Sequence, residues 1–349
     1  MDQISEPINL LLRIAVNLLF ALASFHAVVA QSDSLILDNG NLIVGEIKGM
    51  DKDILQMKTA YGRDVFRIKW EEVSEIYSSS TYIITIDDGS RLYSTINSDP
   101  DRPQQVTIGA GPYQRTVKLI DLVSITSVEE KPLGGFSASV SLGFNRTKNS
   151  NLRQFSSRLS LRYEHDSWNC LGFFDMVTSS RDNTEDFSRI HGLVLAHYYL
   201  KNDWLLVAYT DLLSNEEQQL QLRSVLSAGI GKFVIHNNRA RLKFSGGAVI
   251  NSEKFKEGIE SNRSQELFLG GLLDMFNVGD FSIFAKLLLY PGISESGRLR
   301  SDFKFDLKYN LIFSFYVKLG YTLNYDNQPV EGASETDYVL QTALGWNFK

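Results

Sequence analysis

The chain has 349 residues, enough for one large domain or two of medium size. Its net charge of -6 comes from 41 acidic and 35 basic residues, and this mildly acidic balance gives no electrostatic basis for binding nucleic acid. Hydrophobic residues make up 43% of the chain and the mean hydropathy is -0.13. A soluble all-β protein and a membrane β-barrel both have such values, because barrel strands alternate apolar with polar residues.

Residues 1–30 are typical of a secretory signal peptide. Arg13 precedes an apolar run that ends in Ala27-Val28-Val29-Ala30, which suits signal peptidase and makes Gln31 the first mature residue. The alternative is an uncleaved membrane anchor. The only cysteine is Cys170, so an exported chain would have no internal disulfide framework.

An internal repeat with an offset of 49 residues occupies residues 31 to about 130. The turn signals Asp38-Asn39-Gly40 and Asp87-Asp88-Gly89 are one such pair. Apolar positions follow the same offset without a gap: Leu35 with Ile84, Ile47 with Ile96, Met57 with Val106, Ile76 with Ile125. We predict two small SH3- or Sm-like β-barrel modules in tandem, residues 31–80 and 81–130. The alternative is one domain of six to ten strands with internal symmetry.

Residues 135–349 are predicted to form an antiparallel transmembrane β-barrel of about twelve strands. Twelve segments of about ten residues alternate apolar with polar side chains. They start near Phe136, Arg153, Trp168, Phe187, Trp204, Leu220, Ala240, Gln265, Phe281, Arg298, Phe313 and Tyr338. Short and long connections alternate along the chain, as in outer-membrane barrels. A soluble lipocalin-like or sandwich protein is the alternative.

One face of these segments is too charged to be a protein core, so we expect it to line a wet lumen. The candidate lumen-lining residues are Arg158, Arg162, Arg241, Lys243, Arg300, Asp302, Lys304, Asp306, Lys308 and Lys318. Arg189, Arg223, Lys286, Glu164, Asp175, Glu266 and Asp274 are expected on the same face, which then carries eleven basic and six acidic residues. An open lumen of this kind would favour anions, whereas an ion-paired interior would not conduct.

The last segment predicts how the barrel would be inserted. Gln341, Ala343, Trp346 and Phe348 are similar to the C-terminal signal that the barrel-insertion machinery of Gram-negative outer membranes reads, although Ala343 replaces the usual glycine and Lys349 follows the aromatic end. An even number of strands puts both barrel ends on the side of the short turns, and therefore the N-terminal modules in the periplasm. Trp168, Trp204 and Trp346 are expected near that boundary, as an aromatic girdle.

A signal peptide, small β modules and a C-terminal barrel together resemble the YdiY-type family of salt-induced outer-membrane proteins. The resemblance covers most of residues 135–349 and rests on the strand pattern and the terminal signal. It implies an outer-membrane location, but the family brings no substrate, cofactor or site residue to this chain. The N-terminal tandem is a departure from it.

No catalytic constellation stands out. His165-Asp166-Ser167 has the His-x-Ser spacing of a lipid A deacylase but falls in a short turn, and His191 and His197 are about 20 Å apart along one strand. We therefore expect a protein without cofactor or metal that is not an enzyme, with a role in envelope maintenance or small-solute passage. One alternative is a membrane anchor whose modules bind a periplasmic protein or the cell wall; another is a lipid-modifying enzyme. Expected partners are outer-membrane lipid and the insertion machinery, with no nucleic acid.

Overall fold

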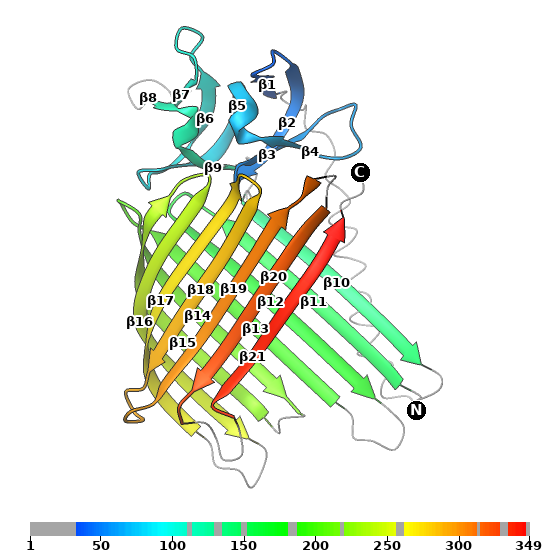
Figure 1. Cartoon of the computed structure of the whole chain (residues 1–349), viewed down its shortest axis with the longest axis vertical. Coiled ribbons are helices and arrows are strands. Elements are labelled where there is room, and N and C mark those ends of the chain that lie inside the picture. Colours follow the sequence, from blue (N-terminus) through cyan, green and yellow to red (C-terminus); the bar gives the residue numbers. More distant parts are fainter. Residues whose placement is uncertain are drawn as a thin grey trace, which may run out of the picture. The chain divides into compact units, whose positions relative to one another are not determined.

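The structure is a computed structural model that describes residues 33–109, 114–128, 135–147, 152–180, 187–216, 220–255, 262–312, 315–328 and 334–346. The predicted signal peptide and Phe348 lie outside these residues. Every long element is a strand (Figure 1), so the chain is all-β as predicted. No helix within these ranges has the length and apolar character to cross a membrane.

The N-terminal region forms one nine-stranded sheet. Its strands are β1 (Asp33–Leu37), β2 (Leu42–Asp51), β3 (Ile54–Lys58), β4 (Phe66–Lys69), β5 (Val73–Ile86), β6 (Arg91–Ser98), β7 (Gln105–Ile108), β8 (Arg115–Lys118) and β9 (Leu122–Ser127). Strands β1, β2, β9 and β5 pair in a closed ring, which makes a small four-stranded barrel. The pair β3–β4 extends the sheet from β2, and β6–β7–β8 extend it from β5.

The two sequence repeats share this small barrel. The first half of β5 closes the first copy by pairing with β1, and its second half opens the next copy by pairing with β9. One hydrophobic core contains matched residues of both copies, among them Leu35, Ile84, Ile76 and Ile125. The expected pair of separate modules is therefore wrong: each copy exchanges strands with the other, and one symmetric domain results.

Hydrogen bonds repeat with the same offset of 49 residues. Gly40 N–H donates to Leu37 O at 2.8 Å and Gly89 N–H donates to Ile86 O at 2.9 Å, so both predicted hairpin turns form. Both glycines have positive φ, +81° and +80°, where a residue with a Cβ is strained. The short 3-10 helices Trp70–Glu72 and Leu119–Asp121 are also 49 residues apart, and the Trp70 indole donates to the carbonyl of its counterpart Leu119 at 2.9 Å.

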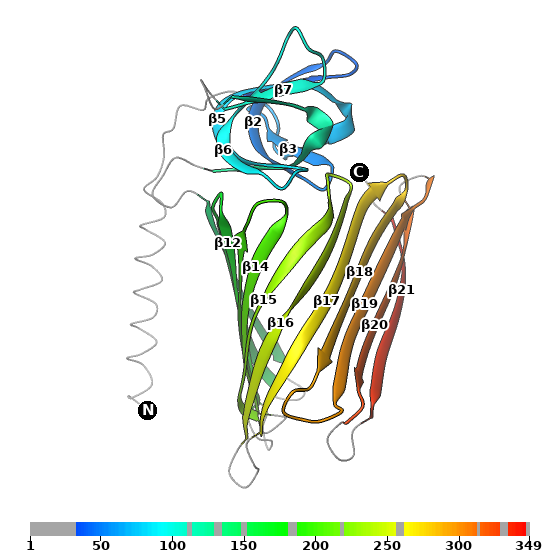
Figure 2. The same ribbon diagram turned by 90° about the vertical axis from the view of Figure 1, so that its left-hand side faces the viewer.

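The C-terminal region forms a twelve-stranded antiparallel sheet in which every strand pairs with the next along the chain. Its strands are β10 (Phe136–Thr147), β11 (Leu152–Glu164), β12 (Trp168–Ser180), β13 (Phe187–Tyr199), β14 (Trp204–Asn215), β15 (Leu220–His236), β16 (Ala240–Phe255), β17 (Asn262–Val278), β18 (Phe281–Pro291), β19 (Leu299–Asn310), β20 (Phe315–Asp326) and β21 (Thr336–Trp346). Each begins within three residues of its predicted start. Figure 2 shows these strands tilted and side by side in a curved wall.

The sheet is not closed by hydrogen bonds. Strand β10 pairs only with β11, and β21 pairs only with β20, so two edges remain open. Both edge strands are exposed along nearly all their length. The twelve predicted strands are thus confirmed, whereas their closure into a barrel is not seen.

Candidate functional site

One face of the twelve-stranded sheet, here called the polar face, collects the predicted lumen residues. A single row of directly paired residues defines it from β10 to β17: Ser137, Arg162, Leu171, Leu195, Tyr209, Ser227, Val249 and Glu266. The Arg300 guanidinium on β19 bonds Glu266 on β17 across the intervening strand. Ser227, Val249 and Glu266 are at most 9% exposed, whereas their chain neighbours Leu226, Ile250 and Leu267 are at least 39% exposed, as expected when the row lies on the concave face.

Strand register places all ten candidate lumen residues on the polar face. On β19, Arg300, Asp302, Lys304, Asp306 and Lys308 alternate with an apolar set, as predicted. Arg241 is paired with Asp274, and Lys243 with Leu272. The remaining candidates, Arg158, Arg162 and Lys318, lie on the same side of β11 and β20.

Glu266 and Arg300 make the most buried ion pair of this face. Glu266 is 1% exposed, and Arg300 Nε lies 3.1 Å from its Oε1 while a second guanidinium nitrogen reaches Oε2. Arg300 also stacks over the Tyr290 ring at 5.1 Å. A paired, bidentate geometry of this kind compensates the burial of the carboxylate. Arg300 therefore acts as a structural partner rather than as a free cation.

Four lysines of β18–β20 form a basic group that we call the lysine patch: Lys286, Lys304, Lys308 and Lys318. Lys286 is directly opposite Lys304, and Lys308 is directly opposite Lys318, although like charges in such cross-strand pairs repel. Among the described residues the patch forms one ion pair, between Lys304 and Asp306 at 3.3 Å. Lys286, Lys308 and Lys318 form no ion pair among the described residues, and a positive group of this kind would attract an anion.

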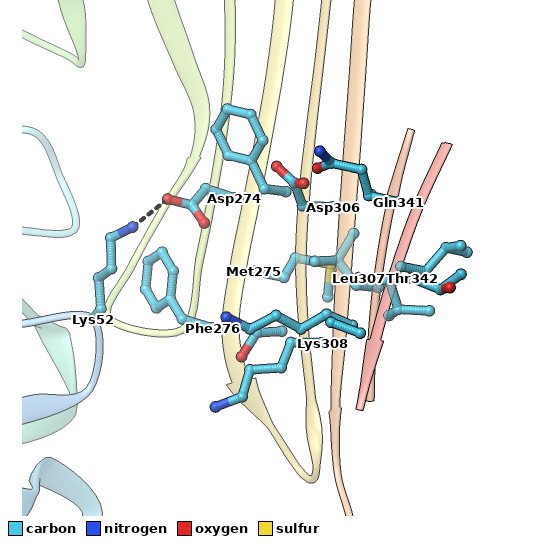
Figure 3. A pocket seen from close by; sticks show the side chains of 16 residues that line it. Lys52, Asp274, Met275, Phe276, Asp306, Leu307, Lys308, Gln341 and Thr342 are labelled. Carbon is cyan, nitrogen blue, oxygen red and sulfur yellow. Dashed lines mark hydrogen bonds and ion pairs between the residues drawn. The ribbon is translucent and has the colours of Figure 1, made fainter. Parts of the chain in front are cut away.

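The lysine patch borders a cavity of about 440 Å³ (Figure 3). Lys308, Asp306 and Gln341 contribute to its lining from β19 and β21. Lys52 of the small barrel also reaches it, with its Nζ 2.7 Å from an Asp274 carboxylate oxygen. The Phe276 ring also lines the cavity, 5.2 Å from Lys52 Nζ.

Sequence reasoning missed several acidic residues of the polar face. Asp211 pairs with Val225, Glu253 with Arg223, and Asp326 with Arg300, so all three carboxylates share this face. The alternation in β14, β16 and β20 is sufficient to find them, because all three continue the polar positions of these strands. They bring the count closer to balance, and they lie away from the lysine patch, toward the longer loops.

The small barrel is ion-paired to the polar face at its short-turn end. Besides the Lys52–Asp274 pair, Arg241 bonds Asp51 at 2.5 Å. Arg91 donates to the Asp166 carbonyl at 2.8 Å and lies 3.9 Å from the Tyr199 ring centre. Three residues of the small barrel, Asp51, Lys52 and Arg91, thus contact side chains or carbonyls at this end of the sheet.

Two aspartates of the small barrel have raised pKa values. Burial raises the pKa of Asp53, which is 2% exposed and accepts a hydrogen bond from Asn238 at 3.4 Å. Burial also raises the pKa of Asp87, and the neighbouring carboxylates of Asp121 and Asp88 add to the effect. Ionisation of either group therefore opposes folding.

The other candidate chemistries form no catalytic arrangement among the described residues. His165, Asp166 and Ser167 contact one another within one turn: Ser167 Oγ donates to Asp166 Oδ1 at 2.8 Å, the same oxygen contacts His165 Nδ1, and the Ser167 N–H donates to His165 Nδ1 at 3.3 Å. The Ser167 hydroxyl thus donates to the aspartate and not to the imidazole. His191 bonds Asp211 at 2.7 Å, whereas His197 bonds Asn169 at 3.1 Å. Across the described ranges no group of three or more His, Cys, Asp or Glu side chains could hold a metal ion.

The opposite face, here called the apolar face, is lined by exposed hydrophobic side chains. Leu142, Leu226, Leu269 and Leu344, from four strands, are 57–72% exposed. Aromatic pairs gather at the short-turn ends of its strands: Tyr163 with Trp168, Phe281 with Tyr309, and Phe315 with Trp346. Trp204 lies at the same end, beneath Lys232 at 5.2 Å. The three predicted tryptophans therefore share one face and one end of the sheet.

Comparison with known proteins gives one family. The family described as "Protein of unknown function, DUF481" matches residues 140–348, which cover β11 to β21 and most of β10. A search of curated proteins finds no match.

Proposed function

Since the chain belongs to the DUF481 family, whose function is unknown, we propose its function from its own geometry: a β-barrel of the outer membrane that passes small solutes, anions in preference. In this role it needs no cofactor and is not an enzyme. The observation that carries the proposal is the division of one twelve-stranded sheet into a polar concave face and an exposed apolar face.

The apolar face is suited to lipid. Water-exposed sheets of this size do not leave leucines of four strands 57–72% exposed on one face, because large apolar surface drives association. Hydrocarbon would remove that cost. The aromatic pairs at the short-turn ends fit the polar headgroup boundary, where amphipathic rings are enriched.

In a membrane the open edges β10 and β21 would have to pair. Each unsatisfied backbone group in hydrocarbon costs several kcal/mol, so spanning sheets are closed. Strand β10 begins at the short-turn end and β21 finishes there, so the two are antiparallel. Even-numbered residues such as Val140 and Thr342 lie on the apolar face in both strands, so closure keeps that face continuous.

The partners follow from this arrangement. Outer-membrane lipid covers the apolar face, and the barrel-insertion machinery reads the terminal strand through Gln341, Ala343 and Trp346 together with Phe348. The short turns and the small barrel lie on the periplasmic side. The lysine patch supplies the anion preference, because rings of basic side chains favour anions.

A second candidate function is an anchor that presents the small barrel to a periplasmic protein or to the cell wall. The contacts of Asp51, Lys52 and Arg91 favour it, because they engage groups at the short-turn end of the polar face and restrict passage there. Conductance in a planar bilayer distinguishes the two functions, because a channel would carry current and an anchor would not.

Closure is tested by cross-linking in the full chain, with Cys170 replaced by alanine. We expect a disulfide between Val140→Cys and a cysteine at Thr342 or at Leu340 or Leu344, two positions away on the same face. Val140→Cys with Gln341→Cys is the control, because Gln341 lies on the opposite face. Absence of any cross-link, with a protein that stays soluble without detergent, would reject the barrel.

Transport is tested by single-channel current in planar bilayers. We expect anion-selective current from the full chain, and Lys304→Glu with Lys308→Glu should reverse the selectivity. Arg300 is unsuitable for this reversal because its replacement would leave the buried Glu266 carboxylate without its ion-pair partner. A cross-linked barrel without current would leave the anchor as the function.

A further inference from the structure

The polar face is not polar throughout. On β12–β14 it carries an apolar strip of six side chains, where the strands farther along carry charges: Leu171, Phe173, Leu193, Leu195, Leu205 and Val207. Register places them on the polar face, because Leu171 belongs to the row that ends at Glu266, and Leu193 lies opposite both Phe173 and Asp211. A lumen that carried only small hydrated ions would gain nothing from this strip.

A cavity of about 580 Å³ lies over one end of the strip. Leu171, Phe173 and Leu193 form its floor, and the serines Ser137 and Ser139 of the edge strand β10 form one wall. This volume is within the range of small-molecule sites in proteins, which are mostly apolar with a few placed polar groups.

A basic side chain completes the cavity. Arg162 lines it next to Leu171, its direct cross-strand partner, and is 59% exposed. Its ion pair with Glu164 is long, at 3.9 Å, and the same carboxylate also contacts Arg91 and Asn169. Arg162 is therefore only weakly compensated. Its neighbour Arg158, by contrast, donates to the Asp175 carboxylate at 3.1 Å, and its guanidinium carbon lies 5.8 Å from the centre of the Phe173 ring.

We propose that this cavity binds an amphipathic anion with a single acyl chain, the chain lying on Leu171, Phe173 and Leu193 and the carboxylate or phosphate headgroup at Arg162. A guanidinium pairs both headgroups with two parallel hydrogen bonds, and the floor contributes in proportion to the apolar area that the chain covers. The cavity lies on the polar face, so in the closed barrel an acyl chain reaches it through the lumen.

This inference rests on the proposed membrane location and deepens the proposed anion preference. It differs from simple anion passage in one measurable respect, because the acyl chain contributes to affinity. The lysine patch on β18–β20 lies outside this cavity.

The test uses the full chain in amphipol and dodecanoate as the probe, measured by isothermal titration. Acetate supplies the headgroup alone, dodecanol the chain alone, and dodecyl phosphate the other headgroup.

We expect dodecanoate and dodecyl phosphate to bind, and acetate to fail to compete. Arg162→Gln should weaken both anions about tenfold or more while leaving dodecanol unchanged, since charge-assisted hydrogen bonds have about twice the strength of neutral ones. Leu193→Asn should weaken all three chain-bearing probes.

Two variants outside the cavity provide matched controls. Lys232→Gln removes a cation from the apolar face of β15, and Val225→Asn adds an amide to the polar face of the same strand; neither should change the affinity for dodecanoate. Competition by acetate as strong as that by dodecanoate, or equal loss in the cavity and control variants, would overturn the inference. The same protein is also run heated and unheated on detergent gels, where a folded barrel migrates differently in the two states, and its current is recorded. A folded barrel that does not bind dodecanoate would reject the lipid site alone, whereas a chain without heat-modifiable migration would reject the barrel.

Discussion

Asp33 is a fully buried carboxylate, and the small barrel depends on how it is satisfied. Its oxygens accept the Ile47 N–H at 2.7 Å and the Tyr82 hydroxyl at 2.9 Å, and the Ser78 hydroxyl contacts it as well. Asp33 and Tyr82 are counterparts in the repeat, 49 residues apart. The bond between them thus joins the two copies at the centre of the closed ring.

Tyr82→Phe should destabilise the small barrel by about 1.5–3 kcal/mol, the range for hydrogen bonds to charged groups. Hydrogen exchange of the Ile47 amide in the full chain measures the effect locally. Tyr77→Phe is the matched control. The Tyr77 hydroxyl also donates to a carboxylate, that of Glu75 at 2.6 Å, and this hydrogen bond raises the pKa of Tyr77 to about 12. The Tyr77–Glu75 pair, however, is only partly buried. Equal exchange rates in the two variants would contradict a special role for Asp33.

Asp53 is expected to weaken the fold when ionised. Its folded pKa is raised above 3.8, mainly by burial, so its stabilising contribution is present below that value and is lost as the pH rises through the folded pKa. Asp53→Asn should therefore raise the unfolding temperature at pH 7 and flatten its dependence on pH. Asparagine tolerates the positive φ of 60° at this position.

The neighbouring variant Asp51→Asn should have the opposite sign at pH 7, because it removes the partner of Arg241. If Asp53→Asn lowers the unfolding temperature at pH 7, burial is not the dominant effect on this carboxylate.

The two hairpin turns of the small barrel are equivalent elements in different surroundings. A Cβ at Gly40 would meet no atom within 4 Å, whereas a Cβ at Gly89 would lie 2.5 Å from the Asp203 amide nitrogen in the twelve-stranded sheet. Both substitutions by alanine carry the strain of positive φ, about 1–2 kcal/mol.

Gly89→Ala should cost distinctly more than Gly40→Ala, because the Asp203 backbone has to move as well. Thermal unfolding of the two variants in the full chain measures the difference. Equal costs would mean that the turn at Gly89 does not bear on the sheet.

The strands and turns show how much of the structure could be predicted from the sequence. The twelve strands were predictable because alternation over ten residues has a period that no helix has. The turns at Gly40 and Gly89 were predictable because Asp-Asn-Gly and Asp-Asp-Gly specify positive φ locally. The merger of the two copies could not be predicted. Besides β1 and β3 of its own copy, β2 also pairs with β9 of the other copy, and this pairing joins residues about 75 positions apart in the chain.

The candidate site was predictable in the same uneven way. Strand parity placed Arg300, Lys308 and Lys318 on one face. It could not distinguish Arg300, which is neutralised by Glu266 across a strand, from the two lysines, which form no ion pair among the described residues. The apolar strip on β12–β14 was not predicted, because the sequence analysis identified the lumen face by its charged residues alone.

For the whole molecule, the contacts of the small barrel with the polar face are the feature that joins its two regions. Arg241–Asp51 and Lys52–Asp274 involve groups that would otherwise line the short-turn end of the sheet. Asp51 is 56% exposed, so a single pair of this kind contributes modestly, about 0.2–1 kcal/mol, and salt weakens it. The arrangement therefore predicts a contact that opens under high ionic strength or charge reversal.

A charge-exchange cycle tests this prediction on the full chain. Asp51→Arg puts two guanidinium groups together, and Arg241→Asp puts two carboxylates together, so each single variant should weaken the contact at Lys52 and Asp274. The double variant restores an opposite pair. The readout is the yield of a carbodiimide cross-link between Lys52 and Asp274, whose Nζ and carboxylate oxygen are 2.7 Å apart. We expect a several-fold loss of yield in each single variant, recovery in the double variant, and larger single-channel current wherever the yield falls. Additive losses in the double variant would mean that Asp51 and Arg241 act independently, and the small barrel would then not restrict passage through this contact.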